Sequence, residues 1–329
     1  MAVSRSPGPA ARGRCRVQVE VEHVTALRFD DGAPVRAASA VVAFGGGWLV
    51  AQDDATHAAW VRPDGVTPVR ALPPVRGLDT FEEERGTKAL KPDLEAAFVV
   101  PGDLLVDLPG GDGAVVLLGS GSSPARVRGC LLRPPGSADA EPLVADLAPL
   151  YAAVACRLGV DADLLNLEGA CVVGDVLRWF QRGLPDAGVP TASVDVDVRA
   201  LLTALAGEAR PADVPVTGER RYDLGSVRGV GLAVTDAVLL PDGAVLVSAA
   251  AEDTPDPRDD GPVVGSVLAV LDGGVVRDRV DLPHVHGGVA KVEGLGVVEH
   301  TGDGARLLAT VDADDPTEPS LAVGLRVRC

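Results

Sequence analysis

The sequence has few of the residues from which long helices and membrane spans are built. Aromatic residues make up only 3% of the 329 residues, and no apolar run approaches the length of a membrane-spanning helix. Glycine and proline, in contrast, number 39 and 26. Because both residues favour tight turns, the composition predicts many short strands. The length allows either two ordinary domains or one large all-β array.

Cysteine is scarce and irregularly spaced. The five cysteines are an odd number and contain no Cys-x-x-Cys pair, so we expect neither a zinc cluster nor a disulfide framework. The segment from Met1 to Gly13 lacks the apolar core of a secretory signal. We therefore expect a reduced, cytoplasmic protein with a disordered tail at residues 1–13 and a folded domain at residues 14–329.

Positive charge is also in short supply. The 30 basic residues face 47 acidic ones, for a net charge of -17. Such a surface repels nucleic-acid phosphates and anionic membranes, so neither is an expected partner, whereas cations or cationic partners are favoured. The alternative is that the charge serves solubility alone. Only three basic residues are lysines, and two of them, Lys91 and Lys291, stand beside acidic motifs.

A short motif recurs along the chain, in which an acidic residue precedes a small residue at the head of an apolar run. The clearest copies are Leu94-Glu95-Ala96, Leu167-Glu168-Gly169 and Val292-Glu293-Gly294. Two weaker copies are Ser39-Ala40 and Asp236-Ala237, and the spacings from Ser39 onward are 56, 73, 68 and 57 residues. Recurrence at such a period is typical of a repeat architecture.

Each motif heads a predicted hairpin, and two further strand-like runs follow it. Four antiparallel strands repeated five times predict an all-β fold, a single β-propeller. The long third interval leaves a sixth blade open. The run from Cys15 to Val21 is expected to pair with Leu321–Val327 and close the ring. Helical spacing within 147–158, and more weakly within 198–206, predicts one or two short helices in loops.

Hairpin geometry brings the motifs and the ends of the second strands to the same end of each blade. The second strands are followed by polar residues in every copy: Asp53-Asp54, Gly119-Ser120, Gln181-Arg182, Glu252-Asp253 and Asp312. If the first strands line the central channel, all these groups gather around one mouth of it. The sequence thus predicts a single acidic site at the channel mouth.

The motif acids are candidates for catalysis or for metal binding. Glu95, Glu168 and Glu293 can act as general acids or bases. Clustered carboxylates also suit Ca²⁺, for which the candidate ligands are Glu168, Glu293, Asp312 and Glu252. The alternative is that each acid accepts backbone hydrogen bonds from the next blade and fixes the packing between blades. No organic cofactor is expected.

Other polar residues are candidates for binding a small anionic or ester-type ligand. The Gly119-Ser120-Gly121 turn admits a phosphate or carboxylate close to the backbone, and Arg126 lies near enough to pair with it. A plain loop is the alternative, since the lysine of a P-loop is missing. The full set of ligand-binding candidates is Lys91, Ser120, Arg126, Asn166, Arg182 and Lys291.

The chain resembles the phytase-like β-propellers, including the group described as esterase-like activity of phytase. The shared motifs are Asn166-Leu-Glu-Gly169, Lys291-Val-Glu-Gly294, Lys91-Pro-Asp-Leu-Glu95 and Trp179-Phe-Gln-Arg-Gly183. The resemblance spans roughly Ser39 to Val327 and implies a propeller, six-bladed in the best-known relatives. It also implies calcium bound by channel-mouth acids at Glu95, Glu168, Glu293 and Asp312.

The sequence lacks the hallmark motif of the phytases, Asp-Asp-Pro-Ala-Ile-Trp. Asp53-Asp54 and the later Trp60 match that motif only in part. Phytase activity itself is therefore not expected. The leading hypothesis is a metal-assisted hydrolase of an ester or phosphoester. The alternative is a non-catalytic propeller that binds a small ligand or a protein partner on the same face.

Overall fold

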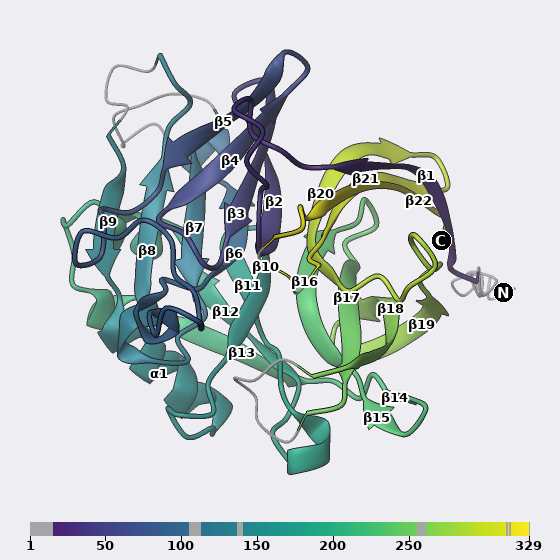
Figure 1. Cartoon of the computed structure of the whole chain (residues 1–329). Helices are drawn as coiled ribbons and strands as arrows, with labels where there is room; N and C mark the ends of the chain where they lie inside the picture. Colours follow the sequence, from purple (N-terminus) through teal and green to yellow (C-terminus); the bar gives the residue numbers. More distant parts are fainter. Residues whose placement is uncertain are drawn as a thin grey trace, which may run out of the picture.

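The chain folds into a closed ring of antiparallel sheets around a central axis (Figure 1). The computed structural model describes residues 16–104, 113–136, 141–254, 261–313, 315 and 317–328. Within these residues there are five four-stranded sheets and one two-stranded sheet. The predicted β-propeller is therefore confirmed, and the described blades number five.

In four of the blades the order of the strands follows the chain. Blade one comprises β2 (Ala38–Phe44), β3 (Gly47–Gln52), β4 (His57–Arg62) and β5 (Gly65–Arg70). Blade two comprises β6 (Leu94–Val99), β7 (Val115–Gly119), β8 (Arg128–Leu132) and β9 (Leu143–Asp146). Blade three comprises β10 (Leu167–Val173), β11 (Val176–Gln181), β12 (Ala192–Asp197) and β13 (Val216–Arg221). Blade four comprises β16 (Ala233–Leu239), β17 (Val245–Glu252), β18 (Val263–Asp272) and β19 (Val275–Asp281).

The fifth blade joins the two ends of the chain. Its order is β20 (Val292–Thr301), β21 (Gly304–Val311), β22 (Leu321–Arg328) and then β1 (Gln18–Ala26), which pairs antiparallel with β22. This arrangement confirms the predicted closure, although the closing strand begins at Gln18 and extends beyond Val21. Pairing the terminal strands removes the open sheet edges that a ring of this kind would otherwise expose. Residues 1–13, expected to form a tail, lie outside the described residues.

Two α-helices lie in loops of the described part of the chain, as the sequence predicts. Helix α1 (Ala148–Leu158) precedes blade three, has Pro149 in its first turn, and ends at Gly159, whose φ of 66° supplies a left-handed cap. Helix α2 (Val198–Leu205) lies between β12 and β13. The Tyr151 hydroxyl donates to the Gly119 carbonyl (2.6 Å), and its ring packs edge-on against Trp179. Thus α1 lies in the second interval, between Glu95 and Glu168, and anchors the loop that ends β7.

Short elements complete the connections between the strands. The 3₁₀ turns are η1 (Lys88–Leu90), η2 (Gly102–Leu104), η3 (Pro124–Arg126), η4 (Pro185–Ala187) and η5 (Pro211–Asp213). The two-stranded sheet pairs β14 (Ser226–Val227) with β15 (Val230–Gly231). No helix in the described part of the chain is long and apolar enough to cross a membrane. The predicted cytoplasmic location stays a prediction.

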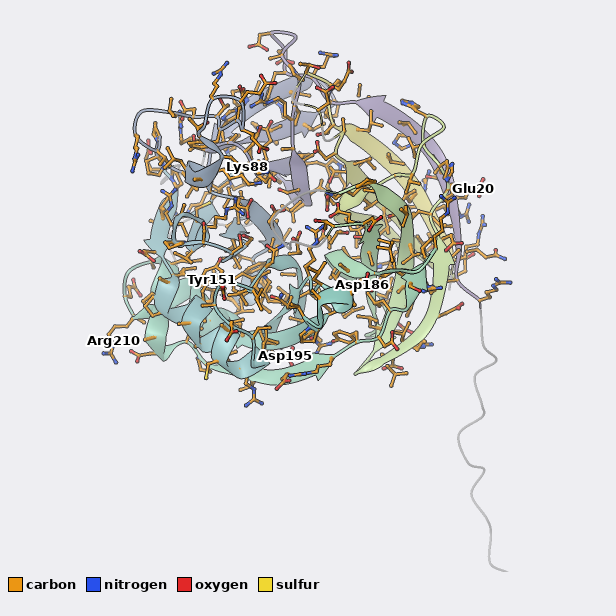
Figure 2. The ribbon with its side chains drawn as sticks, turned by 60° about the horizontal axis from the view of Figure 1, so that its bottom comes forward. Glu20, Lys88, Tyr151, Asp186, Asp195 and Arg210 are labelled. Carbon is orange, nitrogen blue, oxygen red and sulfur yellow. The ribbon has the colours of Figure 1, made fainter. Side chains whose placement is uncertain are left out.

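The five inner strands determine where the site lies. Strands β2, β6, β10, β16 and β20 each pack against the next around the ring, and β20 returns to β2. Their starts therefore converge at one end of the channel. In Figure 2, Lys88 and Asp186, on loops near that end, lie closer to the middle of the ring than Glu20 and Arg210 at its rim.

Candidate functional site

A β-bulge at the start of every inner strand turns one side chain out of the regular pairing. The pairing with the second strand shifts between Ala38 and Ala40, Leu94 and Ala96, Leu167 and Ala170, Val234 and Asp236, and Val292 and Gly294. Such bulges re-aim side chains and are frequent beside active sites. The bulged residues that carry the repeated motif are Ser39, Glu95, Glu168, Thr235 and Glu293.

In blade four the repeated position is one residue earlier than the sequence motif predicted. The bulge there falls on Thr235, whereas Asp236 is already paired with Ser248. Thr235 and Ser39 also make equivalent contacts. Each hydroxyl donates to a backbone carbonyl of the neighbouring blade, at the residue that precedes that blade's bulge. Ser39 donates to Leu94, and Thr235 donates to Val292 (2.5 Å). Asp236 is therefore not the fourth member of the repeat.

Asp236 instead holds two blades together. Its carboxylate accepts the Leu295 amide of blade five (2.6 Å) and the Ala237 amide (2.7 Å), and the side chain does not line the channel-mouth cavity. Burial raises the pKa of Asp236 well above its ordinary value, against the lowering effect of these two amides. The packing role considered for the repeated acids thus applies to this residue.

The glycine after the bulge in blades three and five permits close contact between neighbouring inner strands. A Cβ atom at Gly169 would lie 2.3 Å from the Asp236 Cα, and one at Gly294 would lie 2.9 Å from the Ala40 Cα. These are backbone contacts that a flexible side chain cannot relieve. The motif therefore has two separate causes. Its acidic side chain points to the channel, and the residue that follows must be small because the backbone of the next strand lies against it.

The bulged side chains line a cavity of about 360 Å³ at the channel mouth. Of the predicted site residues, the cavity is lined by Lys91, Glu95, Arg126, Asn166, Glu168, Arg182, Lys291, Glu293 and Asp312. It is also lined by residues that were not singled out as ligands, including Arg36, Asp53, Asp54 and Asp93. Most of the predicted site is therefore brought together.

Two predicted residues lie behind the cavity wall. Ser120 is fully buried, and its hydroxyl donates to Asp93 and contacts Ser122 (2.8 Å). Glu252, 7% exposed, pairs with Arg182 and with Lys291. Both residues support groups that face the cavity.

The first of two charge networks crosses blades one and two. The Lys91 ammonium lies 2.7 Å from Asp53 Oδ2 and 2.7 Å from Asp93 Oδ1, and Arg126 lies 2.9 Å from Asp93 Oδ2. Burial lowers the pKa of Lys91, but the two carboxylates outweigh this effect and hold it well above its usual value. Burial raises the pKa of Asp93, but Lys91 and Arg126 together bring it below the usual range. Asp93 is thus a buried ionised carboxylate.

The second network crosses blades three, four and five. Arg182 bridges Glu252 and Glu168, with the Glu168 Oε1 atom at 3.5 Å. Lys291 bridges Glu252 (2.5 Å) and Glu293 (2.9 Å). Asn166 Nδ2 donates to Glu168 Oε1 at 2.8 Å. The network holds two cations against three carboxylates.

Burial dominates the pKa of two acids of the second network, Glu168 and Glu293. It raises the pKa of Glu168 to about 8, despite the lowering effect of Arg182. It also raises the pKa of Glu293, against the lowering effect of Lys291. Glu168 is only 4% exposed, so water cannot screen its charge. Glu168 therefore keeps its proton at neutral pH.

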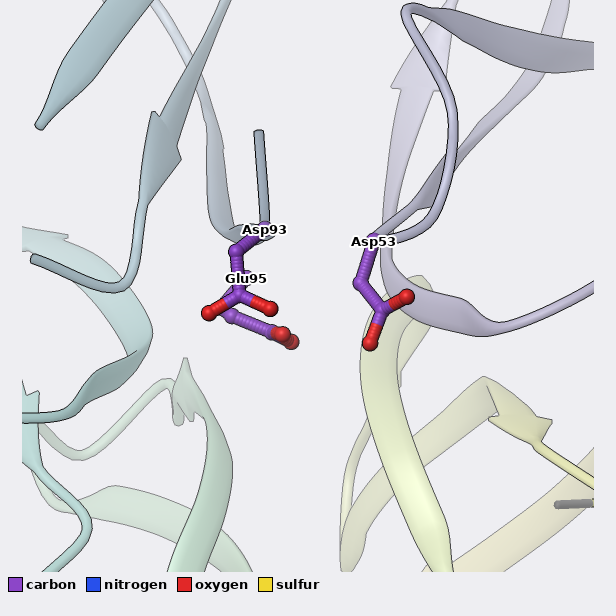
Figure 3. A group of neighbouring side chains, drawn as sticks. All are labelled: Asp53, Asp93 and Glu95. Atoms are coloured by element: carbon purple, nitrogen blue, oxygen red, sulfur yellow. The ribbon is translucent and has the colours of Figure 1, made fainter. Parts of the chain in front are cut away.

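Glu95 lies between the two networks and belongs to neither. Among the described residues, no hydrogen bond or ion pair reaches its carboxylate. Burial raises its pKa well above the ordinary value, and the carboxylates of Glu168 and Asp93 add to the shift. Carboxylate oxygens of Asp53, Asp93 and Glu95 all lie within 4.8 Å of one another. Figure 3 shows Asp93 and Glu95 on one side and Asp53 facing them.

This group is the one set of three possible metal ligands found in the described part of the chain. It shares no member with the predicted metal ligands Glu168, Glu293, Asp312 and Glu252, and it shares only Glu95 with the calcium set that the resemblance implies. Asp312, which accepts a hydrogen bond from Ser320 (2.9 Å), lines the same cavity outside the group.

Sequence reasoning identified Asp53 as a polar residue at the channel mouth but did not identify Asp93 as a site residue. Asp93 has a φ of 55°, a left-handed conformation that is uncommon for residues other than glycine. The Asp93 side chain is only 4% exposed. The available signal was its position within Lys91-Pro-Asp93-Leu-Glu95. A strained backbone at a buried carboxylate points to function once it is observed.

The chain is similar to several solved structures at low sequence identity. Myxococcus xanthus glutaminyl cyclase is 10% identical, with 95% of this chain and 97% of that chain covered and a TM-score of 0.45. A luciferin-regenerating enzyme is 11% identical, covering 89% of this chain and 78% of that chain, with a TM-score of 0.41. A putative gluconolactonase is 14% identical, covering 86% and 71%, with a TM-score of 0.38. Likeness at this level carries no argument about function.

No curated protein matches the chain. The resemblance to phytase-like propellers stays a prediction, because neither these structures nor the family model carries that name. The model described as "Family of unknown function (DUF6910)" matches residues 87–316. Because this match covers more than half of the chain, the protein belongs to that family.

Proposed function

We propose that the channel mouth binds a divalent cation through Asp53, Asp93 and Glu95 and hydrolyses an anionic ester or phosphoester. The observation that carries this proposal is the state of Glu95, a carboxylate on the cavity wall with no described partner. Glu95 is partly buried, and a carboxylate shielded from water without a partner is costly. A cation bound beside Glu95 removes that cost.

The donor set fits a hard divalent cation. Ca²⁺ takes oxygen ligands at about 2.3–2.6 Å, so two oxygens on one ion lie at most about 5 Å apart. The oxygens of the three carboxylates fall within 4.8 Å of one another. They come from two blades, because Asp53 follows β3 whereas Asp93 and Glu95 lie at the start of β6. Calcium is the cation that this chemistry favours.

When bound, such a cation polarises a carbonyl or phosphoryl oxygen. The surrounding residues supply the proton transfers. Asn166 and Arg182 both contact Oε1 of Glu168, so the proton that Glu168 keeps at neutral pH resides on Oε2. Glu168 donates that proton to the leaving alkoxide, and Glu293 accepts one from the attacking water. The products are an alcohol and the free acid or phosphate.

A second candidate function is non-catalytic binding on the same face. Every cation that was expected to orient an anionic ligand already contacts a carboxylate, as Lys91, Arg126, Arg182 and Lys291 do. Paired cations of this kind are also found where charges serve structure alone. Cation binding without turnover would favour this function.

Calorimetric titration of chelator-treated protein with CaCl₂ tests the cation site. Wild type is expected to bind one ion, and Glu95→Gln to bind it at least about tenfold more weakly, a loss of about 1.4 kcal/mol. Glu83→Gln is the matched control, since Glu83 lines the same cavity but its side chain is 81% exposed. Absence of calcium binding by wild type would refute the site.

The reaction is tested separately with nitrophenyl carboxylates and nitrophenyl phosphates, with and without calcium. Glu168→Gln is expected to abolish calcium-dependent turnover while retaining calcium binding. Binding without turnover of any substrate in the panel would favour the second candidate function.

A further inference from the structure

The Lys91 ammonium forms ion pairs with carboxylate oxygens that would bind the proposed cation. It lies 2.7 Å from Asp53 and 2.7 Å from Asp93 Oδ1, while the third carboxylate of the group, Glu95, has no described partner. Lys91 itself lines the cavity, with 15% of its side chain exposed. Lys91 is therefore a positive charge already placed inside a group of three carboxylates.

The two oxygens of Asp93 have different surroundings. Oδ2 contacts Arg126 (2.9 Å) and the hydroxyls of Ser120 and Ser122. Oδ1 is a buried atom that accepts no hydrogen bond of good geometry within the described residues, although the Lys91 ammonium lies beside it. One side of the carboxylate is thus fixed by the protein, and the other faces a group on a flexible four-carbon stem.

We propose that Lys91 holds the cation site until a divalent cation displaces it, and that the displaced ammonium then binds the anionic group of the ligand. This inference rests on the proposed cation site. An ammonium within 2.7 Å of both aspartates cannot stay there beside an ion bound to the same oxygens, because the two positive charges repel. The ligand class is an ester or phosphoester whose anionic oxygen contacts Lys91.

Lys291 provides an internal comparison. Its ammonium also bridges two carboxylates, Glu252 and Glu293, and its side chain is only 6% exposed. Those carboxylates are not part of the group of three. Substituting Lys291 therefore removes one positive charge from the same cavity, as substituting Lys91 does, but it frees no oxygen of the proposed cation site.

The test compares Lys91→Met with Lys291→Met in calcium titrations of the full chain. Both substitutions remove one positive charge, so both strengthen calcium binding through the general field of the cavity. Lys91→Met is expected to strengthen it about tenfold more, within the usual range of coupling between bound species. Equal strengthening by the two variants would overturn the displacement of Lys91.

A second titration tests the destination of the ammonium. Phenylphosphonate, which cannot be hydrolysed as an ester, is added to calcium-saturated protein. Wild type is expected to bind it about tenfold more tightly than Lys91→Met, and equal affinities would overturn the anion-binding role. Lys91→Gln repeats both titrations if circular dichroism shows that Lys91→Met is unfolded. Failure of wild type to bind calcium would refute the cation site itself, whereas these outcomes concern only Lys91.

Discussion

Glu168→Gln tests whether burial holds a neutral acid at the channel mouth. Glutamine has nearly the shape of protonated glutamic acid, so the variant keeps the form that the folded wild type prefers. The pKa of Glu168 is about 8 in the folded protein, against 4.5 for an ordinary glutamate. Between these values the unfolded chain releases the proton while the folded chain retains it. The stability of wild type therefore falls as the pH rises through this window.

The size of the effect follows from the same two values. From pH 4.5 to pH 7 the wild type loses about 3 kcal/mol at this residue, at about 1.36 kcal/mol per pH unit. The glutamine of Glu168→Gln does not titrate, so the variant does not lose this stability. Its unfolding free energy relative to wild type is therefore expected to rise by about 3 kcal/mol from pH 4.5 to pH 7. Above pH 8 the difference is expected to level off.

Urea unfolding followed by circular dichroism at pH 5, 6, 7 and 8 measures the difference. Glu208→Gln is the control, because Glu208 is exposed and its substitution is expected to give a curve parallel to wild type. A Glu168→Gln curve that is also parallel to wild type would refute the assignment of a buried neutral acid.

Three further predictions concern the packing and pairing of the blades. Asp236→Ala leaves the buried Leu295 amide without its acceptor and is expected to cost about 1–3 kcal/mol of unfolding free energy in urea; an unchanged midpoint would contradict the role of Asp236 between blades. Arg182→Met leaves Glu252 short of a partner and is expected to cost about 3–5 kcal/mol. Adding Glu252→Gln to Arg182→Met should recover part of that loss, and simple additivity would argue against coupling. Gly169→Ala places a Cβ atom against the backbone of the next blade and is expected to lower the thermal midpoint, at a cost of about 1–3 kcal/mol.

The sequence was sufficient to predict the propeller because its turns and its repeat point to the same fold. The motifs, which recur at intervals of 56 to 73 residues, predicted the number of blades. Glycine turns marked the hairpins, as at Gly46 with a φ of 76°. Ring closure also followed from the sequence, since the last unit was one strand short. The alignment failed in blade four because a bulge leaves one residue unpaired. Alternation along a strand cannot show whether Thr235 or Asp236 is that residue.

The channel mouth was predictable as a place, but its individual contacts were not. Hairpin geometry requires the motif acids and the residues after the second strands to lie at one end. The role of Asp93 depends on a left-handed backbone and on a loop anchored by Tyr151, which no local pattern shows. The same loop turns Ser120 behind Asp93, away from the cavity. Such contacts depend on packing between distant segments.

The most direct test of the account is the position of calcium in crystals grown with CaCl₂, found by anomalous diffraction at long wavelength. The account predicts one peak about 2.3–2.6 Å from oxygens of Asp53, Asp93 and Glu95, with the Lys91 ammonium withdrawn from both aspartates. A peak among Glu168, Glu252 and Glu293, or no peak at the channel mouth, would contradict it.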